Sequence, residues 1–210
     1  MVYSSVDYTL TANVEELHLT DSARKGNGND LDNALYGNQL RNVLHGAAGS
    51  DYLSGGDGND RLYGEAGHDR LQGGSGKDRL FGGSGDDVYF FSRGDNRDRI
   101  VEDDDSAGNH DVLQFLRDVD HNQLWFSRHG KDLRIDLIGT SDRVTIDGWY
   151  RGADHQVEEI RTAGGFSLTS RQIDQLTMVM ASFNPPAAGE LTLSPELQEQ
   201  LAPVLAAAWS

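Results

Sequence analysis

Large apolar residues recur every nine positions through the middle of the chain. Between residues 28 and 90 each successive nonapeptide carries one at its eighth position, next to mostly polar residues. The last three residues of each unit are too short for a helix, and their alternation is typical of a strand with the apolar side chain inward. Two nonapeptides therefore predict one coil of turn, strand, turn and strand. The apolar positions are Leu35, Leu44, Leu53, Leu62, Leu71, Leu80 and Tyr89.

Glycine and aspartate occupy fixed positions in the same repeat. Five contiguous copies, residues 46–90, have glycine at positions one and four and aspartate at position six. Two earlier copies, 28–36 and 37–45, keep the first glycine but carry Asn33 and Asn42 in place of aspartate. Glycine reaches backbone angles that other residues avoid, so the first six positions predict a tight turn. Stacked coils then predict a solenoid with two parallel sheets and a thin leucine core.

The fixed position of aspartate has a chemical consequence. Turns on the same side of the solenoid are two nonapeptides apart in sequence and adjacent in space, so the aspartates stack along two edges. Carboxylates about 5 Å apart, the spacing of neighbouring strands, repel each other. Calcium, a hard cation that prefers six to eight oxygen ligands, would relieve this repulsion, because glycine turns expose carbonyl oxygens beside each carboxylate. The alternative is that the Gly–Asp pairs only mark ordinary turns. The residues are Asp51, Asp69 and Asp87 on one edge, with Asp60 and Asp78 on the other.

The nine-residue period stops after Phe90, where a second pattern begins. Short alternating segments predict strands, with hairpin turns at 129–131 and 139–141. We expect residues 91–184 to form an antiparallel β cap on the solenoid, with a helix at about 170–183. A predicted strand at 14–20 indicates an N-terminal cap over residues 1–27, since solenoid ends need covering. The strands expected in the C-terminal cap are 99–101, 111–116, 123–127, 132–137, 142–146, 157–160 and 166–168.

Two smaller segments complete the pattern. Residues 185–210 contain a helix start at Ser194, a proline at 203 that we expect to limit or kink the helix, and an apolar, nearly uncharged end. Residues 103–108 resemble the start of an EF-hand loop, but Ala107 and Gln114 stand where that loop needs ligands. We expect this stretch to be a solvated acidic loop, with an accessory cation site as the alternative.

The repeat resembles the calcium-binding nonapeptide GGxGxDxUx of the repeats-in-toxin (RTX) proteins, in which U is a large apolar residue. The segments at 111–115, 132–135 and 147–150 are similar to the region that follows RTX blocks, and 185–210 resembles the uncleaved secretion signal of type I export substrates. The resemblance implies an all-β fold, a parallel β-roll over 28–90. It places each calcium ion between consecutive same-side turns. One turn supplies the carbonyls of positions two and four with its Asp, and the next supplies those of positions one and three with its Asp.

Applied to this chain, the resemblance implies about three strong calcium sites, and up to five or six in all. The first joins Ala47, Gly49 and Asp51 to Gly64, Ala66 and Asp69. The second joins Gly56, Gly58 and Asp60 to Gly73, Ser75 and Asp78. The third joins Glu65, Gly67 and Asp69 to Gly82, Ser84 and Asp87. Weaker sites use Asn33 with Gly46, Ala48 and Asp51, and Asn42 with Gly55, Asp57 and Asp60.

Composition narrows the class of function. The chain has 34 acidic and 18 basic residues, a net charge of −16 that argues against nucleic acid or an anionic membrane as partner. It has no cysteine, and no apolar run reaches the about 20 residues of a membrane span. No sequence motif of a catalytic centre is found. We therefore expect a monomeric, non-catalytic calcium-binding module of a secreted bacterial protein, which folds on calcium after type I export and stabilises an upstream effector. The alternatives are an adhesive or carbohydrate-binding module, and part of a polysaccharide-active or hydrolytic secreted enzyme.

Overall fold

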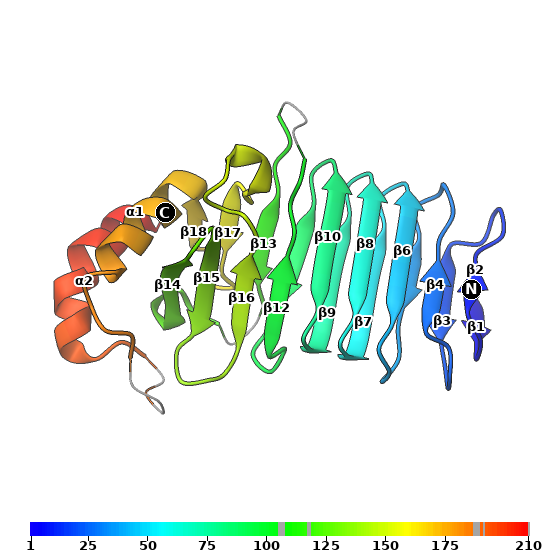
Figure 1. The fold of residues 1–210 in the computed structure, drawn as a ribbon, viewed down its shortest axis with the longest axis horizontal. Coiled ribbons are helices and arrows are strands. Elements are labelled where there is room, and N and C mark those ends of the chain that lie inside the picture. Colours follow the sequence, from blue (N-terminus) through cyan, green and yellow to red (C-terminus); the bar gives the residue numbers. More distant parts are fainter. Residues whose placement is uncertain (105–107, 117–118, 187–189, 191, 210) are drawn as a thin grey trace.

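The computed structural model describes residues 1–104, 108–116, 119–186, 190 and 192–209. Within these residues the chain winds between two nine-stranded sheets, and Figure 1 shows the strands side by side from the N-terminus to the helices at the far end. The first sheet contains, in spatial order, β1 (Val2–Ser4), β3 (Glu16–Leu19), β5 (Ala34–Tyr36), β7 (Tyr52–Gly58), β9 (Arg70–Gly76), β11 (Val88–Phe91), β13 (Val112–Phe115), β17 (Glu159–Arg161) and β18 (Ser167–Thr169). The second contains β14 (Leu124–His129), β15 (Asp132–Leu137), β16 (Arg143–Ile146), β12 (Arg97–Ile100), β10 (Arg79–Ser84), β8 (Arg61–Ala66), β6 (Val43–Ala48), β4 (Lys25–Asn27) and β2 (Tyr8–Thr9).

The leucines of the repeat fill the space between the two sheets. In the first sheet Leu53 pairs with Leu71, and Leu71 with Tyr89; in the second, Leu62 pairs with Leu80. All five side chains are almost fully excluded from solvent and belong to one apolar cluster. Neighbouring coils are in register at a spacing of two nonapeptides, so the parallel β-roll predicted from the repeat is confirmed.

The N-terminal segment, residues 1–27, extends the roll. Strand β1 pairs in parallel with β3, and β3 pairs with β5 at the same two-nonapeptide offset as the regular coils. Strand β2 pairs with β4, and β4 with β6, at this offset too. Leu17 lies in register with Leu35 and is equally buried. The segment expected to form a cap thus consists of further coils, although it lacks the Gly–Asp signature.

The C-terminal flank continues the parallel sheets before it turns antiparallel. Strands β12 and β16 pair in parallel, as do β11 with β13 and β13 with β17. The predicted hairpins are present, since β14 pairs with β15 and β15 with β16 in antiparallel fashion. The expectation of a wholly antiparallel flank is therefore corrected: β12, β13, β16 and β17 prolong the roll, because the exposed edges of β10 and β11 favour further parallel strands.

Two helices close the C-terminal end. Helix α1 (Ser170–Met180) begins with the predicted capping box of Thr169 and Gln172. Helix α2 (Pro195–Ala208) is capped by Ser194 and continues through Pro203, so the expected limit at this proline is wrong. Its end packs onto the flank, where the Trp209 ring lies 6.4 Å from the Phe126 ring. No helix in the described part of the chain is long and apolar enough to cross a membrane.

Candidate metal centre

The position-six residues form two rows along opposite edges of the roll. Row 1 contains Asn33, Asp51, Asp69 and Asp87, and row 2 contains Asn42, Asp60 and Asp78. Within each row the backbone N–H of one member donates to Oδ1 of the next, two nonapeptides later. The N···O distances are 2.7 Å for Asn33–Asp51, 2.8 Å for Asp51–Asp69, 2.8 Å for Asp69–Asp87, 2.7 Å for Asn42–Asp60 and 2.6 Å for Asp60–Asp78. Each carboxylate therefore binds the preceding turn of its own row.

The second oxygen of each predicted aspartate has no protein partner. The side chains are at most 1% exposed, and every Oδ2 is buried without a hydrogen bond. A buried carboxylate oxygen with no donor is costly, because it loses its hydration without replacement. The atoms are Oδ2 of Asp51, Asp60, Asp69, Asp78 and Asp87.

These unpartnered oxygens face carbonyl oxygens of the next same-side turn. A Cβ placed on Gly64 would lie 2.2 Å from Asp69 Oδ2 and 2.5 Å from the Gly82 carbonyl oxygen, so both oxygens border one small space. Gly67 has φ +141°, and a Cβ there would lie 1.8 Å from the Gly49 carbonyl oxygen. Glycine is thus required at both positions, at one to leave room beside the carboxylate and at the other to let the turns approach. Carboxylate and carbonyl oxygens around a small space are the donor set that calcium prefers.

Positions two and four of the five regular turns share a left-handed backbone. Two of these residues are not glycine: Ala47 has φ +91° and Glu65 has φ +80°. This conformation costs a non-glycine residue about 1–2 kcal/mol, so a surrounding interaction must hold it. Both residues are predicted carbonyl ligands, and the conformation recurs in every regular turn. The five regular turns therefore share one backbone shape, held against this strain by the stacking of the turns.

The electrostatics of the rows oppose the ionised, metal-free state. Burial is the main cause that raises the pKa of Asp51 and Asp60 to about 7, that of Asp69 to about 6 and that of Asp87 to about 8. Neighbouring carboxylates add to the rise, and the backbone donors partly oppose it. The pKa of Asp78 is raised as well, again mainly by burial. Without a counter-ion these groups would take up protons near neutral pH.

The two degenerate turns are arranged differently. The Oδ1 atoms of Asn33 and Asn42 accept from the backbone N–H of Asn29 and Asn38, at 2.7 and 2.8 Å. The side chain of Asn38 donates to the Ala23 carbonyl at 2.9 Å, which ties this turn to the one before it. Neutral amide oxygens that already have donors give a poorer cation site than unpartnered carboxylates. The asparagine turns and the aspartate turns therefore offer different sets of oxygen donors.

Both rows extend beyond the nonapeptides, which the sequence pattern did not reveal. In row 2 the Asp78 N–H donates to Asp98 Oδ1 at 3.0 Å, and Asp98 Oδ2 is buried without a partner. In row 1 the Asp87 N–H donates to Asp111 Oδ1 at 2.8 Å. These two steps are 20 and 24 residues long, so a nine-residue period could not find them. The available signal was an aspartate two positions before a core residue, as in Asp98 and Ile100.

The acidic loop after β12 is more buried than expected. Asp104 is 9% exposed, so the expectation of a solvated loop over 103–108 does not hold for this residue. Residues 105–107, which include the EF-hand position at Ala107, lie outside the described part of the chain. Asp103 remains exposed and lies near His155 and Asp154.

Fold and site together define a parallel β-roll with rows of carboxylates suited to calcium. Comparison with protein families agrees with this class: the profile of the RTX calcium-binding nonapeptide repeat matches residues 36–71 and 63–98. The profile of the haemolysin-type calcium binding protein related domain matches residues 132–172. Residues 36–98 are therefore RTX haemolysin-type calcium-binding repeats, followed by a flank of the related type.

Among solved structures, the chain is similar to the AlgE6R3 subunit of the mannuronan C5-epimerase from Azotobacter vinelandii. The two are 28% identical, and the match covers 74% of this chain and 87% of that one, with a TM-score of 0.37. At this TM-score the two structures superpose only loosely. The assignment of the roll therefore stands on its strand register and on the repeats.

Proposed function

We propose that this chain is a calcium-dependent folding module of a secreted bacterial protein, with no catalytic activity of its own. Its proposed parts are a roll over 28–90, continued by coils on either side, a flank to residue 184 and a tail at 185–210. It acts as a monomer and stabilises an upstream effector. The observation that carries the proposal is the set of buried Oδ2 atoms without partners in both rows.

The energetic argument starts from the cost of these oxygens. An isolated buried carboxylate is unstable, and each row brings several of them within one strand spacing of each other. Calcium bound to the folded turns and not to the unfolded chain contributes its binding free energy to folding. We assign ions to the three strong sites named above and to the Asp78–Asp98 step, which has the same unpartnered oxygen. The Asn33 and Asn42 turns are assigned weaker sites.

Calcium concentration makes this folding depend on the compartment. Extracellular calcium modules bind at about 10⁻⁴–10⁻³ M, too weakly to fill in a cytosol. A chain that stays unfolded until it meets external calcium is suited to passage through a type I exporter. RTX repeats are characteristic of secreted proteins, which agrees with this route. We propose that residues 185–210 address the chain to that exporter.

We assign the carboxylates of both rows a structural role. The buried aspartates of both rows are bonded to the preceding turns, and each is placed by the repeat. Such groups are structural ligands, so their raised pKa values do not indicate an acid–base pair. A module of this kind contributes stability to a neighbouring domain.

Far-ultraviolet circular dichroism tests the proposal on the full chain. After verified removal of calcium we expect a largely disordered spectrum, and β structure should appear cooperatively on calcium titration. Magnesium should substitute poorly, because it needs a smaller and more regular oxygen shell. A spectrum that is the same with and without calcium would overturn the proposal.

A further inference from the structure

The last nonapeptide turn, residues 82–87, faces a loop in place of another nonapeptide. Strand β10 pairs with β12 through Leu80 and Ile100, so Glu102 corresponds to Gly82. Strand β11 pairs with β13 through Val88 and Val112, so Asp111 corresponds to Asp87. Residues 102–104 and 108–111 therefore stand where the next turn of row 1 would stand.

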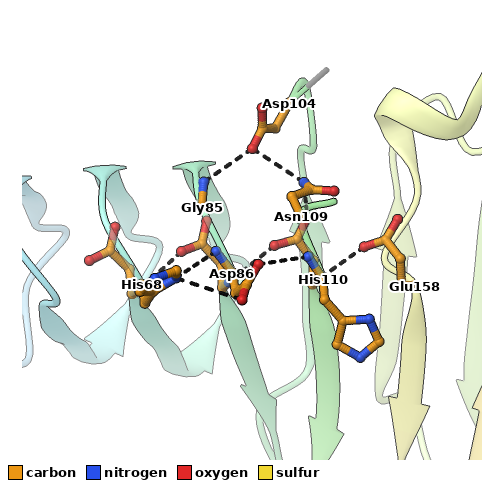
Figure 2. Close-up of polar contacts among 10 residues, drawn as sticks. His68, Gly85, Asp86, Asp104, Asn109, His110 and Glu158 are labelled. Carbon is orange, nitrogen blue, oxygen red and sulfur yellow. Dashed lines mark hydrogen bonds and ion pairs between the residues drawn. The ribbon is translucent and has the colours of Figure 1, made fainter. Parts of the chain in front are cut away.

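This loop brings its own carboxylates to the turn. The Gly85 N–H donates to Asp104 Oδ2 at 3.1 Å, and Asn109 bridges Asp104 and Asp111 with N···O distances of 3.2 and 2.9 Å. Figure 2 shows Asp104 beyond Gly85 and Asn109, at the end of the turn. The Asp111 N–H in turn donates to Glu158 Oε2 at 2.8 Å, so the C-terminal flank holds the loop from the other side.

Glu102 stands at position one, where a regular turn places a glycine whose carbonyl oxygen faces the preceding carboxylate. Here the Glu102 carbonyl lies 2.9 Å from His155 Nδ1, and the side chain is buried at 2% exposure. Its Oε1 accepts from the Tyr89 hydroxyl, while its Oε2 has no partner.

Asp87 Oδ2 and the Tyr89 hydroxyl border one small space beside Gly82. A Cβ on Gly82 would lie 2.0 Å from Asp87 Oδ2 and 2.3 Å from the Tyr89 hydroxyl, which bonds to Glu102. Asp87 is fully buried, and its Oδ2 also lacks a donor. Among the described residues, no lysine or arginine forms an ion pair with Asp87, Glu102 or Asp111. These buried carboxylates thus meet at the last turn without a lysine or arginine of the described residues paired to any of them.

We propose that Asp87, Glu102, Asp104 and Asp111 form a further calcium site between the last repeat and the residues that follow β12. This site lies at the end of the regular repeats and has four side-chain carboxylates, where each repeat site has two carboxylates and four backbone carbonyls. More carboxylate charge raises calcium affinity, so this ion binds more tightly than those of the repeats. Because Glu158 holds Asp111, the ion also couples the roll to its C-terminal flank.

Counting bound calcium by native mass spectrometry tests the site on the full chain. Glu102→Gln keeps the shape of the side chain and removes its charge, and we expect one bound ion fewer than in the unaltered protein. The matched control is Glu199→Gln, the same change of side chain at an exposed residue of helix α2, which should leave the ion count unchanged. Tryptophan fluorescence gives a second readout, since Trp125 and Trp149 lie in the flank and Trp209 packs against it. Its calcium midpoint should rise about threefold or more in Glu102→Gln.

The site rests on the proposed function, because it needs a roll that folds with calcium. The possible outcomes distinguish failure of the site from failure of the proposed function. If the unaltered chain binds no calcium, the proposed function and this site both fail. If it binds calcium and Glu102→Gln binds as many ions with the same midpoint, only this site is overturned. That second result would mean that Glu102 is held as a neutral acid, which glutamine imitates. If Glu102→Gln does not fold, Asp104→Asn carries the test, with the loss of one ion supporting the site and an unchanged count overturning it.

Discussion

The backbone N–H of Asp69 donates to Oδ1 of Asp87 at 2.8 Å, although these residues lie two nonapeptides apart in the chain. Asp69 Oδ1 accepts in the same way from the Asp51 N–H. Each carboxylate thus bonds to one turn with one oxygen and leaves the other for a ligand. Neighbouring turns therefore share carboxylates, and the loss of one should affect two sites.

Substitution of single row members tests this sharing. Asp69→Ala removes a carboxylate from the first and third strong sites, and we expect a calcium midpoint about tenfold or more higher, with lower cooperativity. Asp87→Ala should be similarly damaging, because Asp87 also faces Asp111. Asn33→Ala should have a smaller effect, since its oxygen is neutral and already accepts a hydrogen bond. Calorimetric titration of the three variants measures this, and equal effects of Asn33→Ala and Asp69→Ala would refute the pairing of same-side turns.

Low pH should partly substitute for calcium in stabilising the folded state. The pKa values of about 6–8 in Asp51, Asp69 and Asp87 exceed the ordinary 3.8, so protonation favours the metal-free fold. This stabilisation is complete below about pH 4 and is lost as the pH rises from 6 to 8. Metal-free protein should therefore show more β structure at pH 5.5 than at pH 8, by circular dichroism.

The same linkage predicts how calcium affinity changes with pH. Protons compete with calcium for the carboxylates, so the calcium midpoint should rise as the pH falls from 8 to 5.5.

Asp69→Asn should reduce the pH dependence of the metal-free fold, because it removes one titrating group. A metal-free chain that is equally disordered at both pH values would contradict the burial of these carboxylates.

Because the turns stack closely, a substitution at Gly67 should lower the folding stability strongly. Gly67→Ala adds a Cβ 1.8 Å from the Gly49 carbonyl oxygen and also imposes the penalty of φ +141°. We expect it to lower the calcium-bound stability by more than about 3 kcal/mol. Gly165→Ala is the control, since it has φ +84° but open space around it. This control should cost about 1 kcal/mol, and urea unfolding in saturating calcium compares the two. Equal losses would show that the turns are not closely packed at Gly67.

Removal of residues 185–210 separates export from folding. Deletion should abolish secretion by a cognate type I exporter if the tail is the address. The roll should still gain β structure with calcium, because its strands do not include the tail. The flank should melt at a lower temperature, since Leu201 and Trp209 of the tail are buried against it. Unimpaired export of the shortened chain would disprove the assignment.

Sequence alone determined the regular part of the roll. Leu53 and Leu71 belong to units of equal length, so inward leucines and turn aspartates could be placed in register from their spacing. The predicted capping box at Thr169 is equally local, because its two partners lie within one helical turn of each other. Such features depend on short segments whose geometry the residue types specify.

Tertiary structure decided where the roll ends and what completes its last turn. The coils in residues 1–27 have no Gly–Asp signature and form because the edges of β5 and β6 accept parallel strands. Asp111 joins row 1 across 24 residues, and Glu102, which follows the repeats, accepts a hydrogen bond from Tyr89 of the last repeat. The length of a loop does not determine its path. Packing against the flank and hydrogen bonds to it, such as that from the Asp111 N–H to Glu158, select the path. These carboxylates become neighbours only when the sheets have paired.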